Sequence, residues 1–264
     1  RVNTLPLQCV WAMLTLTYCC SAPISGFSQI SYPIFEHLTT EDGLSSNKVE
    51  AIIQDHEGFY WIATQNGLNR YDGTSFKVFR DHEGDSTSLS NDFCTALAED
   101  SHGDILVATY NGISRYLKEK AQFQPIFVSH PTRNLETANW IRSILVDKHD
   151  NIWISGIGLW KYDHLTGKII FFNHDKKDRT SIPADGLIGK MVYDSLRDGL
   201  WLTVDQQMNF LDISHSQFFH ADHNPAQWVI FDQGKDAELT LDRDHQIWFR
   251  NQENMLCAFK PEEN

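Results

Sequence analysis

The chain has 264 residues, of which 41% are hydrophobic and 22% charged, and its formal net charge is −13 at pH 7. This length and apolar fraction are sufficient to bury a sizeable core. An acidic balance with no Lys/Arg-rich run argues against binding to a nucleic-acid backbone or to an anionic membrane surface, since both need clustered basic residues. Neutral ligands, cations and proteins remain as partners.

The first part of the chain has the pattern of an export signal. Arg1 precedes the apolar run Cys9–Cys20, and small residues follow in Ser21–Gln29. This order predicts a secretory signal peptide over residues 1–28, with a buried first helix or an anchor at the start of the chain as the alternative. Beyond it only Cys94 and Cys257 remain, each inside an apolar run. We therefore expect buried free thiols and no disulfide or CxxC metal site.

The rest of the chain repeats one unit about five times. The anchor of each unit is an aromatic or apolar residue, and successive anchors are 45, 47, 48 and 47 residues apart: Trp61, Leu106, Trp153, Trp201 and Trp248. An aspartate precedes each anchor by six or seven residues: Asp55, Asp100, Asp147, Asp194 and Asp242. A regular period of this size is typical of repeat architectures.

Each unit contains four short apolar runs separated by turn residues. In the first unit the runs are VEAIIQ, YWIAT, LNRYD and FKVF. Runs of this length with β-branched and aromatic residues predict four antiparallel strands. The predicted fold is an all-β propeller of four-stranded antiparallel blades over residues 29–264, with repeats near 44–88, 89–136, 137–186, 187–233 and 234–264.

Several repeated residues have a structural explanation. The tryptophans are expected to fill the space between neighbouring blades, and the aspartates to accept hydrogen bonds from backbone amides in the first turn. Glycines are expected where φ is positive, and an aromatic residue ends the third strand of the first unit: Gly58, Gly67, Gly103 and Tyr71. His245 holds the glycine position in the fifth unit, so that turn should be strained or of another type.

Two closures of the ring are consistent with the repeats. Residues 34–38 could supply the last strand of a five-bladed ring. Alternatively, the chain is the front part of a longer propeller, and we favour this second reading with seven blades.

The first unit identifies a family. Leu44–Asp72, LSSNKVEAIIQDHEGFYWIATQNGLNRYD, resembles the two-component regulator propeller repeat, which builds the periplasmic sensor region of hybrid two-component histidine kinases in Bacteroidetes. The resemblance implies a periplasmic segment that senses oligosaccharides, a dimeric receptor, and a membrane span and kinase that have no counterpart in these residues. Membrane contact is expected only through that missing span.

No residue pattern predicts catalysis, a cofactor or a metal. The repeated aspartates belong to equivalent turns around a rim, too far apart to act as a carboxylate pair. The densest histidine group, HSQFFHADH, has no known zinc-ligand spacing. A propeller glycosidase or lyase remains an alternative function, as does a protein-docking scaffold.

A binding face is predicted where the chain enters the innermost strands. In register, polar residues stand at Asn47, Asp92 and Asn139, and the next residues include Lys48, Phe93 and Trp140. Amide, carboxylate and aromatic groups together are suited to a sugar. Alternatively, these polar residues only cap strand entries. The candidate ligand-binding residues are Asn47, Lys48, Asp92, Asn139 and Trp140.

Overall fold

The computed structural model describes residues 35–126, 141–251 and 253–261. The chain divides into two units, residues 1–37 and 38–264, and the strands of the described residues lie in the second. The described residues contain nineteen strands, one 3-10 turn at Thr40–Asp42 and one short helix, α3, at Ile230–Gln233. No helix in these ranges has the length and apolarity needed to cross a bilayer. The predicted signal peptide, residues 1–28, lies outside the described residues.

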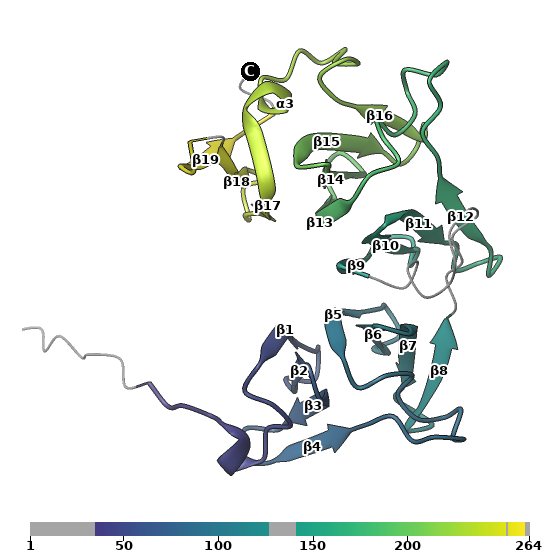
Figure 1. Ribbon diagram of the computed structural model, residues 1–264, viewed down its shortest axis with the longest axis vertical. Helices are drawn as coiled ribbons and strands as arrows, with labels where there is room; N and C mark the ends of the chain where they lie inside the picture. The colour runs from purple at the N-terminus through teal and green to yellow at the C-terminus, as the bar shows by residue number, and fades with distance from the viewer. Residues whose placement is uncertain (1–34, 127–140, 252, 262–264) are drawn as a thin grey trace, which may run out of the picture. The chain divides into compact units, whose positions relative to one another are not determined.

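The strands form five antiparallel sheets, numbered here in chain order (Figure 1). Sheet 1 contains β1 (Val49–Gln54), β2 (Tyr60–Thr64), β3 (Gly67–Tyr71) and β4 (Phe76–Phe79). Sheet 2 contains β5 (Cys94–Glu99), β6 (Ile105–Thr109), β7 (Gly112–Leu117) and β8 (Gln122–Ile126). Sheet 3 contains β9 (Ser143–Val146), β10 (Ile152–Gly156), β11 (Gly158–Tyr162) and β12 (Ile169–Phe172).

Sheet 4 contains β13 (Ile188–Asp194), β14 (Gly199–Val204), β15 (Gln207–Asp212) and β16 (Gln217–Phe219). Sheet 5 contains β17 (Gly234–Leu241), β18 (Ile247–Asn251) and β19 (Leu256–Phe259). A single residue pair, Gln207 with Lys235, joins these two sheets. Each of the five sheets lies within one of the predicted repeats.

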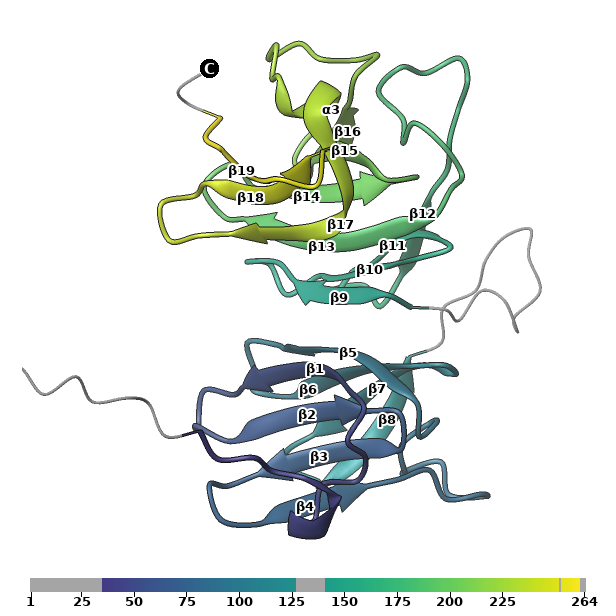
Figure 2. The ribbon, with the colours of Figure 1, turned by 60° about the vertical axis from the view of Figure 1, so that its left-hand side comes forward.

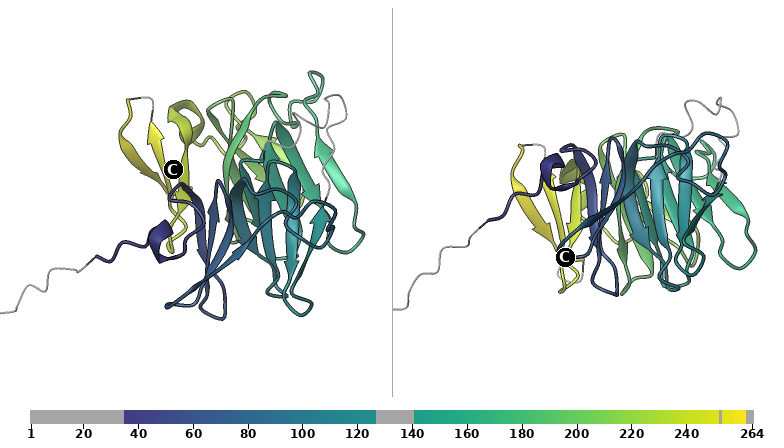
Figure 3. Two further views of the ribbon diagram at one scale, coloured as in Figure 1. Left: turned by 60° about the horizontal axis from the view of Figure 1, so that its bottom comes forward. Right: turned by 90° about the horizontal axis from the view of Figure 1, so that it is seen from below.

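The sheets follow one another radially. The first strand of each sheet contacts the first strand of the next, in the order β1, β5, β9, β13 and β17. These first strands form the inner side of an arc in Figure 1, and Figures 2 and 3 show successive sheets packed face to face. The predicted all-β propeller of four-stranded antiparallel blades is therefore confirmed.

The hydrophobic core consists of layers between successive sheets. The layer between sheets 1 and 2 contains Trp61, Leu68 and Val107, and similar layers follow around the arc. The first four anchors are at most 1% exposed, whereas Trp248, on a face of sheet 5 that no other described sheet covers, is half-buried. Burying a whole indole removes about 200 Å² from water, on the order of 5 kcal/mol at ~25 cal/mol/Å².

The turn between the first two strands has the same conformation in the first unit, where it contains Gly58, and in the fifth unit, where His245 replaces the glycine. Gly58 has a φ of 94°, and the amide N–H of Gly58 donates to the Asp55 carbonyl at 2.9 Å. His245 has a φ of 58°, and its N–H donates to the Asp242 carbonyl at 3.2 Å. The fifth turn is thus of the same type as the first, and it places a β-carbon in the left-handed region, which costs about 1 kcal/mol.

Two further repeat residues lie at the two ends of β3, the third strand of sheet 1. Gly67 has a φ of 114°, and a β-carbon there would lie 2.7 Å from the Phe79 carbonyl oxygen. Tyr71 ends β3 with its ring stacked on Phe76, centroids 4.6 Å apart. A close backbone approach and an aromatic pair thus define the two ends of β3.

The segment proposed to close a five-bladed ring contains no strand. Residues 35–39 have no regular secondary structure, and sheet 5 has three strands within the described residues. The described part of residues 34–38 therefore does not supply a fourth strand to any sheet.

Candidate functional site

The repeated aspartate holds both the turn and the anchor tryptophan. Oδ1 of Asp55 accepts hydrogen bonds from the backbone N–H groups of Glu57 and Phe59 at 3.0 and 2.9 Å. Oδ2 of Asp55 accepts from the indole N–H of Trp61 at 2.8 Å. The same indole bond occurs in sheets 3, 4 and 5, in the pairs Asp147–Trp153, Asp194–Trp201 and Asp242–Trp248.

These bonds explain why the carboxylates are structural. The Trp248 indole, together with backbone amides, holds the pKa of Asp242 below its ordinary value. An ionised carboxylate with donors on both oxygens has little capacity left to act as a base or nucleophile. The aspartates thus fasten each turn to the core, a side-chain pairing that the sequence spacing of six residues could have indicated.

A central cavity of about 480 Å³ is lined by the inner edges of four successive sheets. Its lining residues come from β1, the entry to β5, β5 itself, the β6–β7 turn, the entry to β9, and β13: Glu50, Phe93, Thr95, Tyr110, Ile141, Arg142, Gly189 and Lys190. A pocket of this size with aromatic and charged groups is within the range of small-ligand sites.

Irregularities in the inner strands direct side chains to this cavity. The pairing of β1 with β2 shifts between Val49 and Ala51, so Glu50 is the extra residue. The pairing of β5 with β6 shifts in the same way at Thr95. The pairing of β13 with β14 shifts between Ile188 and Met191, around Gly189 and Lys190. Such β-bulges redirect a side chain away from the regular alternation of the strand.

An aromatic pair forms one wall of the central cavity. The rings of Phe93 and Tyr110 stack with centroids 4.1 Å apart and planes at 15°. The backbone N–H of Tyr110 donates to the Phe93 carbonyl at 3.1 Å, which holds the two residues together. Tyr110 is 41% exposed, so a large aromatic surface borders an open cavity.

Polar groups complete the wall. Glu50 accepts from the side-chain amide of Gln65 at 2.7 Å through Oε1, and Oε2 keeps acceptor capacity. The Thr95 hydroxyl donates to the Ile141 carbonyl at 2.8 Å and so links two neighbouring sheets. Arg142 and Lys190 are exposed. The cavity therefore presents an aromatic face beside both hydrogen-bond acceptors and donors.

Of the predicted binding residues, Asn47, Lys48 and Asp92 belong to the described part of the chain, and none of these three lines the central cavity. Oδ1 of Asn47 accepts from the Thr40 N–H at 3.0 Å, and Oδ1 of Asp92 accepts from the Asp81 N–H at 2.7 Å. In the fourth unit Asp185 has the same role, because its Oδ1 accepts from the His174 N–H at 2.9 Å.

These contacts show that Asn47 and Asp92 cap the incoming chain. The Lys48 carbonyl accepts from the Gln65 N–H at 3.2 Å, and its side chain is exposed. Asn139 and Trp140 lie outside the described residues. The ligand role of all five stays a prediction. The lining residues that sequence reasoning missed include Glu50, Thr95 and Lys190, which lie at bulges, since no residue type marks a bulge.

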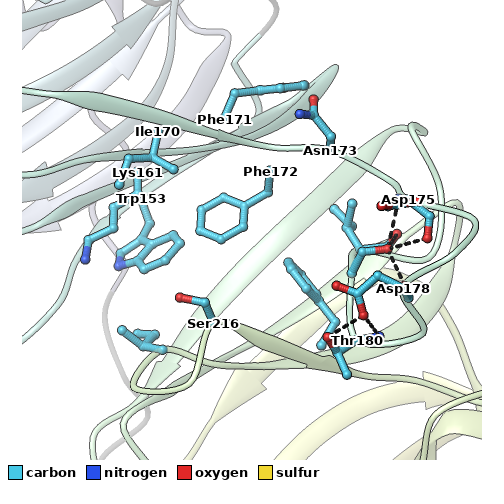
Figure 4. Close-up of a pocket in the computed structure, with 14 residues that line it drawn as sticks. Trp153, Lys161, Ile170, Phe171, Phe172, Asn173, Asp175, Asp178, Thr180 and Ser216 are labelled. Carbon is cyan, nitrogen blue, oxygen red and sulfur yellow. Dashed lines mark hydrogen bonds between the residues drawn. The ribbon is translucent and has the colours of Figure 1, made fainter.

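An outer groove of about 450 Å³ lies between sheets 3 and 4 (Figure 4). Trp153 and Lys161 lie at one end of it, Phe172 lies between, and a loop carrying Asp175, Asp178 and Thr180 lies at the other end. Oδ1 of Asp178 accepts from the backbone N–H and the hydroxyl of Thr180 at 2.9 and 2.7 Å. Because these polar groups are engaged in holding the loop's own conformation, the outer groove is less suited to binding a ligand than the central cavity.

Metal and thiol chemistry find no support in the described ranges. No three His, Cys, Asp or Glu side chains there are grouped as metal ligands. Nε2 of His220 lies 3.1 Å from the Arg179 carbonyl oxygen, and burial lowers the pKa of this histidine. Burial raises the pKa of the Cys94 thiol to about 12, which leaves it protonated and unreactive near neutral pH.

In sequence, the chain matches one family model and one curated protein. The family model described as two component regulator propeller matches residues 43–66. A histidine kinase of Formosa agariphila is 45% identical over 67 residues, which are 25% of this chain and 5% of that protein. The chain therefore spans a small part of the curated relative it matches.

Solved structures share the fold. The extracellular domain of a hybrid two component system from B. thetaiotaomicron has a TM-score of 0.67 at 22% identity, over 85% of this chain and 30% of that one. Virginiamycin B lyase from Staphylococcus aureus has a TM-score of 0.59 at 14% identity, over 89% of this chain and 76% of that one. At these identities the likeness concerns the fold alone.

The sequence matches and the fold agree with the pattern of Leu44–Asp72. The family model covers the first turn, the anchor tryptophan and the preceding inner strand. Residues 43–66 thus match a two-component regulator propeller repeat, and the described sheets have the fold of a propeller.

Proposed function

We propose that this chain is the ligand-sensing propeller segment of a two-component receptor and that it binds an oligosaccharide, without catalysis, in the central cavity. The stacked pair Phe93–Tyr110 beside Glu50 and Arg142 is the observation that carries the proposal. Sugars offer C–H faces to aromatic rings and hydroxyls to charged and polar groups, so this wall suits them.

The relatives support the sensor part of the proposal. The matching repeat is described as a regulator propeller, and the solved relative with the same fold is an extracellular domain. We place this chain in the periplasm for the same reason. A ligand in the central cavity touches four successive sheets, so its binding would bias their relative arrangement, and a dimeric receptor would pass that bias to its kinase.

A matched pair of tyrosine variants tests the site. Tyr110 and Tyr60 are similarly exposed, 41% and 42%, but only Tyr110 lines the cavity. The wild-type protein is titrated calorimetrically with a panel of neutral and acidic oligosaccharides. For a sugar that binds, Tyr110→Ala should weaken the affinity about tenfold, roughly 1.4 kcal/mol, whereas Tyr60→Ala should leave it unchanged.

Three outcomes would contradict the proposal. Equal weakening by both variants would remove the central cavity as the site. Release of cleaved sugar during the titration, seen by product analysis, would replace sensing by a glycosidase or lyase activity. A panel without any binding, together with a co-purifying protein, would favour a docking scaffold.

A further inference from the structure

Two arginines occupy the same position in sheets 1 and 2. Arg70 on β3 pairs across the strands with the anchor Trp61, and Arg115 on β7 pairs with the anchor Leu106. The repeat therefore offers an internal comparison of one side chain in two environments.

Arg115 is neutralised on both sides. Its guanidinium donates to the carboxylate of Asp100, the repeated aspartate of this unit, and its Nε donates to Oδ2 of Asp104 at 3.1 Å. The Arg115 side chain is 18% exposed and the Asp100 side chain 4%. Because Leu106 has no indole N–H, the second oxygen of Asp100 is available to this arginine.

Arg70 has lost both acidic partners. The second oxygen of Asp55 is taken by the Trp61 indole, and Phe59 stands four residues after Asp55, where Asp104 follows Asp100. The Arg70 guanidinium instead lies 4.6 Å from the centroid of the Phe59 ring. Among the described residues no carboxylate pairs with it.

This guanidinium borders a rim cavity of about 760 Å³ between sheets 1 and 2. The cavity lies at the opposite ends of the strands from the central cavity, where the β1–β2 turn faces the β7–β8 turn. Its other basic residues are Arg115, the exposed His102 and Lys120, and Lys118, whose Nζ lies 2.7 Å from Oε2 of Glu57. Glu57 and Asp104 are thus already engaged by Lys118 and Arg115, and the third carboxylate of the lining belongs to the exposed Glu119.

We propose that the rim cavity binds an oxyanion, the carboxylate or sulfate group of an acidic ligand, through Arg70. A guanidinium held over an aromatic ring keeps its N–H groups for other partners, and these N–H groups suit bidentate binding of such a group. Lys120 supplies a second positive charge. In a chain with a net charge of −13, an unpaired arginine in a cavity marks the place where an anion is favoured.

The test uses small anions on the full chain. Glucuronate, glucose 6-sulfate, inorganic sulfate and neutral glucose are titrated at constant ionic strength, followed by calorimetry and by Trp61-region NMR shifts. We expect saturable binding of glucuronate or of the sulfates, and none of glucose in this cavity. Binding of glucuronate alone identifies a carboxylate site, and binding of the sulfates alone identifies a sulfate site.

Charge-matched variants decide the assignment. Arg70→Gln should weaken anion binding at least about tenfold. Arg250→Gln, which removes an exposed arginine on β18, should not change it. Tyr110→Ala should also leave it unchanged, so failure of this proposal and failure of the central site are distinguishable. Equal anion binding by wild type and Arg70→Gln, with unchanged thermal midpoints, or no saturable binding of any anion, would overturn the proposal.

Discussion

Sheets 1 and 2 use different side chains to donate a hydrogen bond to the repeated aspartate. In both, one oxygen of the repeated aspartate holds the turn, through backbone N–H groups two and four residues later. The other oxygen of Asp55 is satisfied by an indole, and that of Asp100 by a guanidinium. The requirement carried by the repeat is therefore a donor to a buried carboxylate, and tryptophan is one of two ways to meet it.

The difference also determines whether the arginine of each sheet has a carboxylate partner. In sheet 2 the arginine binds the carboxylates of Asp100 and Asp104. In sheet 1 the indole performs that task, and Arg70 remains at a cavity wall. A substitution at the anchor position thus decides whether the facing arginine is structural or available for recognition. The predictions below test this comparison.

The largest expected effect is the loss of an anchor. Trp61→Ala empties a fully buried site and leaves Oδ2 of Asp55 without its donor, so the free energy of unfolding should fall by about 3–5 kcal/mol. Trp248→Ala removes the same bond from a half-buried indole and should cost less than about 2 kcal/mol. Urea unfolding of both variants measures the difference, and equal losses would refute the packing role of the anchor.

The two arginines should differ in their contribution to stability. Arg115→Leu leaves a buried carboxylate unpaired and should cost about 2–3 kcal/mol, discounted for the partial exposure of the pair. Arg70→Leu removes a contact with an aromatic ring and should cost less than about 1 kcal/mol. Denaturant unfolding compares the two.

A double-mutant cycle sharpens this result. Combining Arg115→Leu with Asp100→Ala should show a coupling energy of at least about 1 kcal/mol, since each single variant leaves the other group without its partner. Additive losses would mean that Asp100 and Arg115 do not depend on each other.

Acid should weaken the turn that Asp242 holds. The folded pKa of Asp242 is lowered from an ordinary value of 3.8, chiefly by the Trp248 indole. A lowered folded pKa contributes stability above about pH 3.8 that is lost as the pH falls through the folded value. At pH values below 3.8 the temperature midpoint of unfolding should therefore fall as the pH is lowered. This fall should be less steep in the Asp242→Asn variant. An unchanged pH profile in that variant would show that Asp242 does not take part.

The smallest effect concerns the fifth turn. His245 occupies a left-handed conformation that Gly58 adopts without strain in sheet 1. His245→Gly should raise the free energy of unfolding by about 0.5–1 kcal/mol, because relief of strain exceeds the added freedom of the unfolded chain. Calorimetric unfolding measures it. A loss of stability would show that the 3.3 Å approach of His245 Nδ1 to Asp194 matters more than the backbone conformation.

The fold could be predicted because its signals are periodic. The spacing of aspartate and anchor, and the apolar runs between turns, repeat often enough to define the sheets even where Leu106 replaces tryptophan. The cavity could not be predicted in the same way. Glu50 and Thr95 reach it through bulges, which depend on strand pairing rather than on residue type. Asn47 and Asp92 were placed near it by register, but their oxygens bind the backbone.

The central claim is that recognition takes place at the inner edges of the sheets. Hydrogen–deuterium exchange, measured with and without the tightest oligosaccharide of the panel, locates binding along the chain. We expect slower exchange at Phe93–Thr95, at Tyr110 and around Arg142 and Lys190, with no change in the outer groove at Asp175–Ser181. Protection of the outer groove with an unchanged central cavity would contradict the account.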